Sequence, residues 1–455
     1  MNLWKKLLVT GALAGMLNSL PPPSAAQTPL EQYVREGLKS NLVLQQKNVS
    51  VEKASLALQT ASSYFLPAVN FNSSYTSGKG GRSIDIPVGD MLNPVYATLN
   101  ELTHSDNFPQ VRNVKESFFP NNFYDTHLRT TLPLVNTDLH YNRDIQQGQV
   151  ILQEYDLKVY ARDLVRNIKV AYFNYLSARE AVHIYASALQ LLEQHVAVNQ
   201  SLLRNGKALP ATLLRARSEV ETVKAQHQEA QNNVLNARQY FNFLLNKDQQ
   251  APIETSPEGE EIPALPLPTR TEAKDREELE MLKTGERINQ TMVRMNRHFW
   301  VPKVSAFLDL GSQAEGWRFN GPSRYYLAGV SLEVPVFNAG RNNYKTRQSL
   351  LDVKASQLSL TYTARQLEMA ASAALNDLNT AYQNYTASQE RLRAAKSYFK
   401  LMERAYKEGT GTMLEFLDGR NQMTGAQLQL AISTYRVLGS QAQYERETAA
   451  YQLPF

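Results

Sequence analysis

The sequence of 455 residues contains no cysteine. Disulfide bonds, thiolate zinc sites, cysteine nucleophiles and a lipid carried on an N-terminal cysteine are therefore excluded. Long apolar runs are also missing. Beyond the first 26 residues there is no stretch of about eighteen apolar residues, so we expect no membrane-spanning helix there. The seven histidines are scattered and none is paired at metal-ligand spacing, so we expect no metal site and no cofactor.

Strong charge of one sign is absent too. The formal net charge is only +5 at pH 7, which is too weak to indicate nucleic-acid binding. The chain contains no G-x-S-x-G motif, no paired histidines and no acid–base constellation. We therefore expect that the protein is not an enzyme, and an exported hydrolase is the weakest of the alternatives.

Residues 1–26 predict an export signal. Two lysines precede a mostly apolar run from Leu7 to Leu20, and Ser24-Ala25-Ala26 supplies small residues at the cleavage site. We expect the mature chain to begin at Gln27. An N-terminal membrane anchor is the alternative, which the shortness of the run disfavours.

The remaining chain is a duplication. Leu132-Pro133-Leu134-Val135-Asn136 returns 202 positions later as Val334-Pro335-Val336-Phe337-Asn338. Asn205-Gly206-Lys207 returns 203 positions later as Glu408-Gly409-Thr410. Each copy predicts a helix, two strands and then a very long helix that turns back at a glycine. Two such elongated halves favour a structural conduit over an enzyme.

The periodicity of apolar residues sets the expected elements of each copy. For the first copy, residues 27–246, we expect a helix over 28–64, strands over about 65–77 and 124–133, an inserted loop over 78–123 with a short helix near Met91–Leu102, and a coiled-coil hairpin with its tip at 203–211. Residues 247–270, rich in proline and acids, are predicted to be a linker. For the second copy, residues 271–455, we expect a helix over 271–298, strands over about 303–311 and 324–334, and a hairpin with its tip at 406–412.

Both long helices carry heptads, which predict coiled-coil packing. In the first copy the expected buried positions are Leu164, Ile168, Ala171, Tyr175, Ala178, Val182, Tyr185, Leu189, Leu192, Val196 and Leu203. In the second they are Ala374, Leu378, Ala381, Tyr385, Leu392, Ala395, Phe399 and Met402.

Four short strands per chain are too few to close a barrel. Their alternation of apolar and polar residues leaves one face compatible with lipid, so we expect the strands to pair with other copies of the chain. Three chains would supply twelve strands, an even number within the range of outer-membrane barrels.

This ordered set of features resembles the TolC family of outer-membrane channels over nearly all of the mature chain. It is carried by the duplication, by Pro67 and Pro302 at the helix-to-strand junctions, by the turn from Val334 to Arg341 and by the two glycine tips. The resemblance implies a mainly α fold with four β-strands per chain. It also implies a homotrimer whose twelve-stranded outer-membrane β-barrel continues into a periplasmic α-helical barrel.

The resemblance also implies a function. The protein would be a passive exit duct for drugs, small molecules or secreted proteins, in the outer membrane of a Gram-negative bacterium and with a large periplasmic extension. Its partners would be a periplasmic adaptor (membrane fusion) protein, an inner-membrane pump of the RND, ABC or MFS type and outer-membrane lipid. The alternative is a soluble periplasmic coiled-coil adaptor or scaffold, although an adaptor typically presents one helical hairpin and two are expected here.

Two acids stand where the family carries its pore constriction. Glu415 and Asp418 are three residues apart and therefore share one helical face. In a trimer, six carboxylates around one axis would attract cations and make the aperture cation-selective. Solvation of both acids on a coiled-coil surface is the alternative.

The two turns are the expected docking sites for the adaptor, through Asn205, Gly206, Lys207, Glu408, Gly409 and Thr410. The cations expected to be available around them are Arg204, Lys207, Arg215, Lys407 and Arg420, unless solvent alone surrounds them.

The chain also departs from the family. Some members lock the closed tip with a tyrosine, an arginine and an aspartate. Tyr406 matches the tyrosine, whereas Gly411 and Thr212 stand at the other two positions. The closed tip must therefore be held differently here, or less tightly. Residues 78–123 are interpreted as an extended extracellular loop that narrows the barrel mouth, or as a surface insertion without function.

Overall fold

The computed structural model describes residues 28–118, 121–207, 209–256, 262 and 276–453. The expected signal segment and most of the expected linker lie outside these residues. The chain divides into two compact units. We call Val49–Tyr155 with Glu278–Tyr362 the sheet unit, and Met1–Asn48 with Asp156–Glu277 and Thr363–Phe455 the hairpin unit. Within the described ranges, no helix combines the length and apolarity that crossing a membrane requires.

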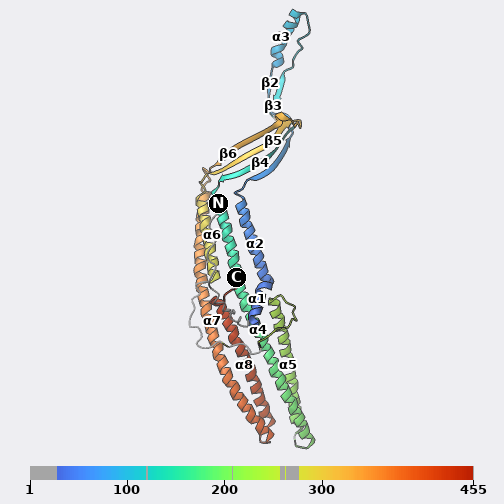
Figure 1. Cartoon of the computed structure of the whole chain (residues 1–455), viewed down its shortest axis with the longest axis vertical. Coiled ribbons are helices and arrows are strands. Elements are labelled where there is room, and N and C mark those ends of the chain that lie inside the picture. The colour runs from blue at the N-terminus through green and yellow to red at the C-terminus, as the bar shows by residue number, and fades with distance from the viewer. Residues whose placement is uncertain (1–27, 119–120, 208, 257–261, 263–275, 454–455) are drawn as a thin grey trace, which may run out of the picture. The chain divides into compact units, whose positions relative to one another are not determined.

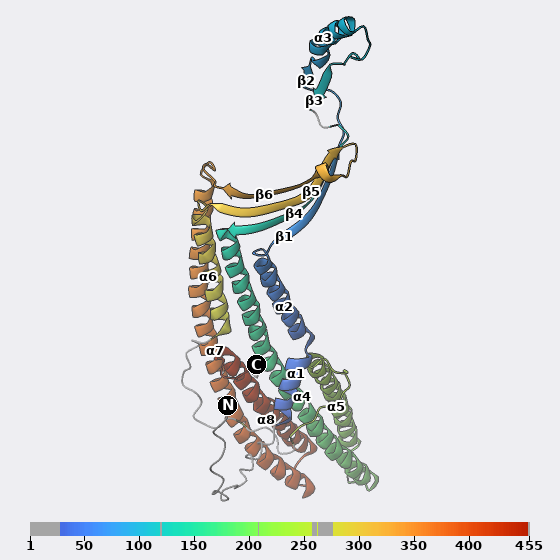
Figure 2. The ribbon, with the colours of Figure 1, turned by 45° about the horizontal axis from the view of Figure 1, so that its top comes forward.

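The sheet unit contains an antiparallel sheet of four strands in the order β1-β4-β5-β6 (Figure 2). The strands are β1 (Ala68–Thr76), β4 (Phe123–Val135), β5 (Lys303–Glu315) and β6 (Arg324–Glu333). The pairing of β4 with β5 joins the strand pair of the first copy to that of the second. The strands β1 and β6 are the two edges of this sheet, and each leaves one row of backbone groups without a strand partner within the described chain.

One face of the sheet is apolar and exposed. Phe71, Leu128, Leu310 and Tyr326 form a row in which each residue is the register partner of the next, so the row crosses all four strands. Opposed residues of an antiparallel pair project from the same face. The same exposed face also carries Val69, Leu308, Val330 and Leu332.

The other face is mostly polar and internally bonded. Arg129 donates to both carboxylate oxygens of Asp309, at 2.8 and 2.6 Å. The Tyr325 hydroxyl donates to Asp125 at 2.8 Å, and the His127 ring lies 3.2 Å from the same carboxylate oxygen. The sheet therefore separates a hydrophobic surface from a hydrogen-bonded polar one.

The insertion between β1 and β4 is a folded module with its own helix and strands rather than a loop. It contains β2 (Ser83–Ile86), α3 (Val88–Thr103) and β3 (Val114–Ser117), and β2 pairs with β3. The expected short helix near Met91–Leu102 lies within α3. The two strands were not expected, because four residues are too few to establish an alternating pattern.

The single helix expected over 28–64 is wrong in one respect. The chain forms α1 (Pro29–Ser40) and α2 (Leu42–Ser63), which are separated by Asn41. Asn41 is extended, with ψ of 124°, and its side-chain oxygen accepts from the backbone N–H groups of Val43 and Leu44, both at 3.1 Å. Asparagine thus caps a new helix at this position instead of continuing the old one.

Two long helical hairpins make up most of the hairpin unit (Figure 1). They are formed by α4 (Thr137–Arg204) with α5 (Pro210–Leu244), and by α7 (Arg341–Lys407) with α8 (Met413–Glu447). Only the beginnings of α4 (to Tyr155) and of α7 (to Tyr362) belong to the sheet unit, together with almost all of α6 (Glu277–Arg297).

The heptad prediction is confirmed for part of each long helix. In α7 the buried expected positions are Ala374, Leu378, Ala381, Ala395 and Phe399, and the half-buried ones are Tyr385, Leu392 and Met402. In α4 the outcome changes along the helix. Expected core positions from Leu164 to Tyr175 are buried, whereas those from Ala178 to Leu189 are half-buried. The buried positions further along are Ile184, Ala188, Leu192, His195 and Asn199. The buried face changes because α4 meets other neighbours there, including Phe399 and Phe416 of the second hairpin.

Candidate functional site: the hairpin tips

Each hairpin turns at a glycine whose backbone is left-handed. The φ angles are 70° at Gly206 and 75° at Gly409. The N–H of Lys207 donates to the carbonyl of Leu202 at 2.8 Å, and the N–H of Thr410 donates to that of Ala405 at 3.0 Å. A Cβ atom at either glycine would meet nothing within 4 Å. The backbone conformation alone therefore requires glycine at these turns.

The residues predicted to dock an adaptor are accessible. All six, Asn205, Gly206, Lys207, Glu408, Gly409 and Thr410, are exposed. Two of them also bond within their own helices. The Asn205 amide donates to the Ser201 carbonyl at 2.9 Å, and Glu408 accepts from Arg404 at 2.8 Å.

Four of the five cations expected near the turns are exposed, but Arg420 is not. Its side chain is only 1 % exposed and donates to Glu219 of α5 at 3.2 Å. Glu219 is also paired with Arg215, at 3.0 Å. Desolvation by burial lowers the pKa of Arg420. The expectation of an available cation at this position is wrong, because Arg420 faces the other hairpin and ties α8 to α5.

The two predicted pore acids lie on one exposed face of α8. The Glu415 carboxylate accepts from the backbone N–H of Thr412 at 2.7 Å and from its hydroxyl at 2.9 Å. In return the Thr412 hydroxyl oxygen accepts from the N–H of Glu415 at 3.3 Å. This reciprocal arrangement is a capping box, and the hydrogen bonds from Thr412 lower the pKa of Glu415. The sequence pattern typical of this capping box is Thr412-x-x-Glu415.

Asp418 is bonded differently. Its carboxylate accepts from the Gln422 amide at 2.8 Å and lies 3.4 Å from the Tyr398 hydroxyl. Desolvation, together with the nearby charge of Asp418, raises the pKa of Tyr398. Asp418 is therefore exposed beside α7, whereas Glu415 also caps the start of α8.

A cluster of four side chains joins the two hairpins just above the turns. We call His195, Asn199, Tyr406 and Phe416 the tip clasp. The Tyr406 hydroxyl donates to the side-chain oxygen of Asn199 at 2.9 Å, which links α7 to α4. Asn199 is 1 % exposed, and its amide donates to the His195 carbonyl at 2.9 Å. The His195 ring packs 3.7 Å from Phe416 and 5.4 Å from Tyr406, measured between ring centroids.

His195 sits in the clasp as a buried base. The residue is 8 % exposed, and its Nδ1 has no hydrogen-bond partner among the described residues. Burial lowers the pKa of His195, the nearby Lys407 lowers it further, and Glu403 opposes both. The ring is therefore neutral at neutral pH. Sequence reasoning missed His195 and Asn199 because they are polar, although they continue the 4-3-4 spacing of Ala188 and Leu192.

Gly411 and Thr212 stand where some family members carry the arginine and aspartate that lock the closed tip, and the local structure accounts for both residues. A Cβ atom at Gly411 would lie 3.0 Å from the Ala405 Cβ, so a larger residue would have to displace this turn. The Thr212 hydroxyl donates to the Leu209 carbonyl at 2.6 Å, in the first turn of its own helix. Tyr406 uses Asn199 as its partner instead.

A cavity of about 810 Å³ opens beside the clasp. Its lining combines residues of both turns, such as Lys207 and Gly409, with the clasp residues His195, Asn199 and Tyr406. Apolar side chains also line it, namely Leu191, Val198, Leu202, Leu209 and Met413.

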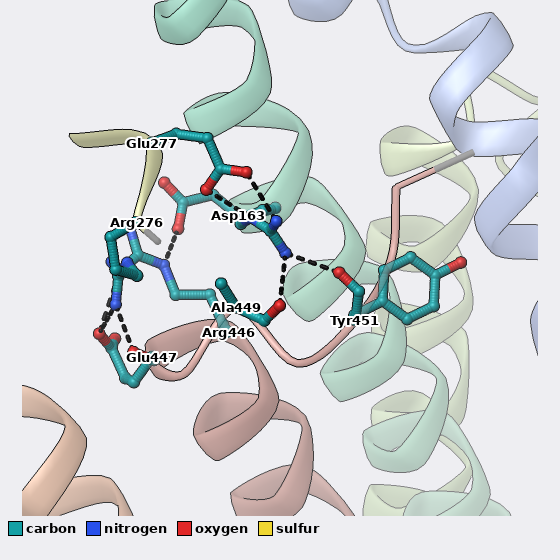
Figure 3. A network of polar contacts seen from close by, with 8 residues as sticks. Asp163, Arg276, Glu277, Arg446, Glu447, Ala449 and Tyr451 are labelled. Atoms are coloured by element: carbon teal, nitrogen blue, oxygen red, sulfur yellow. Dashed lines mark hydrogen bonds and ion pairs between the residues drawn. The ribbon is translucent and has the colours of Figure 1, made fainter. Parts of the chain in front are cut away.

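At the other end of α8, buried ion pairs fix the helix to its surroundings (Figure 3). Arg276 is fully buried and donates to the Glu447 carbonyl at 2.6 Å and to its carboxylate at 2.9 Å. Further contacts include Arg162 with Glu277 at 2.6 Å, Arg162 with the Tyr451 carbonyl at 2.6 Å, and Arg446 with Asp163 at 2.7 Å. Removing one partner of the buried Arg276–Glu447 pair is costly, and the partly buried Arg446–Asp163 pair joins α8 to α4.

Comparisons with known proteins agree with this architecture. A family model described as "Outer membrane efflux protein" matches residues 34–247 and 274–446. The probable outer membrane lipoprotein SilC of Salmonella typhimurium is 21 % identical over 89 % of this chain and 82 % of its own length. The outer membrane protein TolC of Escherichia coli is 21 % identical over 65 % of this chain and 63 % of its own length. A crystal structure of a membrane protein from Pseudomonas aeruginosa superposes with a TM-score of 0.74 at 17 % identity, over 93 % of this chain and 94 % of its own.

Proposed function

This chain belongs to the outer membrane efflux protein family, and from that membership we propose that it is the outer-membrane channel of a tripartite export system. It is a passive trimeric exit duct, which receives drugs, other small molecules or secreted proteins from an inner-membrane pump through a periplasmic adaptor. The observation that carries the proposal is the sheet, with its two chemically distinct faces and its two free edges.

The two faces support insertion in a membrane. Strands between lipid and a water-filled interior place apolar residues outward and polar residues inward. The row from Phe71 to Tyr326 suits acyl chains, and the Arg129–Asp309 face suits water. The same exposed apolar face argues against the soluble adaptor or scaffold, because a soluble monomer rarely leaves so large an apolar patch uncovered.

The free edges support the trimer. Unsatisfied backbone groups cannot remain in lipid, so β1 of one copy must pair with β6 of the next. Three chains then close a ring of twelve strands, an even number within the range for outer-membrane barrels.

The tips support an aperture that opens and closes. The exposed turns at Gly206 and Gly409, with the cavity beside them, would meet the adaptor. Three copies of Glu415 and Asp418 would form the acidic constriction. The Tyr406–Asn199 hydrogen bond would hold the closed arrangement, in place of the lock used by some family members.

The test is reconstitution of detergent-extracted protein in planar bilayers, with native mass measured in parallel. We expect a mass of three chains and small conductance steps that are cation-selective and blocked by trivalent cations. A protein that stays in solution without detergent and gives no conductance would refute the channel and leave the soluble scaffold.

A further inference from the structure

The module inserted between β1 and β4 is held together by side chains that act as backbone partners. On α3, Asn93 accepts from the N–H of Val111 at 2.7 Å and donates to the Val111 carbonyl at 2.9 Å. One heptad further, Asn100 makes the same pair of bonds to Phe108, at 3.0 and 2.9 Å. The two asparagines therefore bind the returning segment as the edge of a strand would.

The face of α3 that bears these asparagines is thus occupied by the module's own chain. Tyr96 reinforces it, since its ring lies 5.8 Å from that of Phe108. Asp90 and Asn113 close the other end, because the Asn113 amide donates to Asp90 at 2.9 Å. This bonding orients α3 and leaves its opposite face outward.

The outward face of α3 has the pattern of a coiled-coil seam. Met91, Val95, Thr98 and Leu102 are spaced 4-3-4 and are all exposed. The exposed fractions of the three apolar members are 69 %, 52 % and 73 %. At 100° per residue the four positions fall within a stripe of about 60°, nearly opposite Asn93 and Asn100. No described residue of the chain covers this seam.

The β2–β3 ribbon adds a second uncovered apolar surface. Ile86 is the register partner of Val114, and Ile84 lies two residues earlier on the same face. All three are exposed, while the other face carries the Asp85–Lys115 ion pair at 3.7 Å. A two-stranded ribbon contributes little stability by itself in water, so a partner that covered these apolar side chains would stabilise the module.

The connections between this module and the four-stranded sheet are short, which limits how far the module can lie from the sheet and therefore which partners it can reach. Residues 77–82 and 118–122 join the module to the ends of β1 and β4. Six residues reach about 20 Å at most when fully extended. In a trimer closed by β1 and β6, three modules are therefore tethered at the same end of one sheet. Such tethers hold binding faces at effective concentrations on the order of millimolar.

We propose that the three α3 helices of a trimer associate with one another along the seam Met91–Val95–Thr98–Leu102, as a parallel three-helix cap. The inference rests on the trimer proposed above. A heptad seam matches copies of itself, and threefold symmetry brings identical positions of parallel helices to the same level. A helix of this length is too short to pair stably without the tether.

The absence of native cysteine makes the test direct. Val95→Cys places one thiol per chain in the seam, and Ala97→Cys places an exposed thiol on the other side of the same helix. Each purified trimer is treated with copper phenanthroline and run on a denaturing gel, and its native mass is measured before oxidation. We expect a two-chain band for Val95→Cys and little or none for Ala97→Cys.

A second change separates association from chance collision. Leu102→Asp brings three carboxylates together in the seam, and we expect it to abolish the Val95→Cys band while the native mass remains that of three chains. A trimer in which Val95→Cys cross-links no more than Ala97→Cys overturns the cap and leaves the channel proposal standing. Protection of the Val95→Cys thiol from maleimide only after lipopolysaccharide is added also overturns it, because lipid then covers the seam. A native mass of one chain refutes both proposals.

Discussion

Removing the Tyr406 hydroxyl tests whether the tip clasp holds the aperture closed. Tyr406→Phe keeps the ring against Phe416 and His195 but deletes the 2.9 Å bond to Asn199. The Asn199 side-chain oxygen is then left buried without this donor, in a residue that is only 1 % exposed. Leaving a buried polar atom unsatisfied costs about 1–3 kcal/mol. The ratio of open to closed tips should therefore rise roughly 5- to 150-fold per chain.

Single-channel recording in planar bilayers measures this ratio as open probability. The matched control is Tyr385→Phe on the same helix, since that hydroxyl accepts from Gln389 at 2.7 Å within α7 and links no two helices. Asn199→Ala should raise the open probability as well, and combining it with Tyr406→Phe should add little further, because both changes remove one interaction. An unchanged open probability in Tyr406→Phe, or an equal rise in Tyr385→Phe, would refute the clasp.

Three other predictions concern the same tips. Glu415→Gln combined with Asp418→Asn removes two charges per chain, while the glutamine preserves the capping box. Reversal potentials should then show weaker cation selectivity. Unchanged selectivity would show that neither acid lines the pore. Burial lowers the pKa of His195 in the closed tip below its ordinary value of about 6.5. As pH falls, His195 therefore takes up a proton more readily in the open tip than in the closed one, so the closed tip is destabilised below about pH 6.5. Open probability should therefore rise on acidification, and His195→Phe should flatten that response whereas exposed His183→Phe should not. Gly409→Ala should impair export more than Gly409→Asn, because asparagine tolerates φ of 75° better, with native mass unchanged in both; if either variant fails to trimerise, the glycine serves assembly alone.

The order of helices and strands could be predicted because it follows from the periodicity of apolar residues and from the prolines and glycines at which elements end. Pro67 and Pro302 mark the helix-to-strand junctions, and Gly206 and Gly409 mark the turns, so the mainly helical fold was predictable from local signals alone. The family model matches residues 34–247 and 274–446, which is most of the chain, and this match confirms the channel class.

What sequence could not supply was the partner of each polar side chain. Arg420 was expected to be available and is buried, while His195 and Asn199 were overlooked and are also buried. Whether such a residue faces solvent depends on which helix crosses it, and heptads within α4 do not reveal that α8 lies against this stretch. The Asn93 and Asn100 bonds were equally hidden, since an asparagine that binds backbone looks like one that ends a helix.

The apolar face of the sheet affects how the protein must behave between export and insertion into the membrane. A newly exported single chain would present Phe71, Leu128, Leu310 and Tyr326 to the aqueous periplasm, beside two open strand edges. Such a surface aggregates or is degraded unless folding is delayed or a chaperone shields it. For the proposed trimer, assembly and insertion would therefore have to be completed together, and variants that cannot assemble should be lost to proteolysis rather than accumulate as monomers.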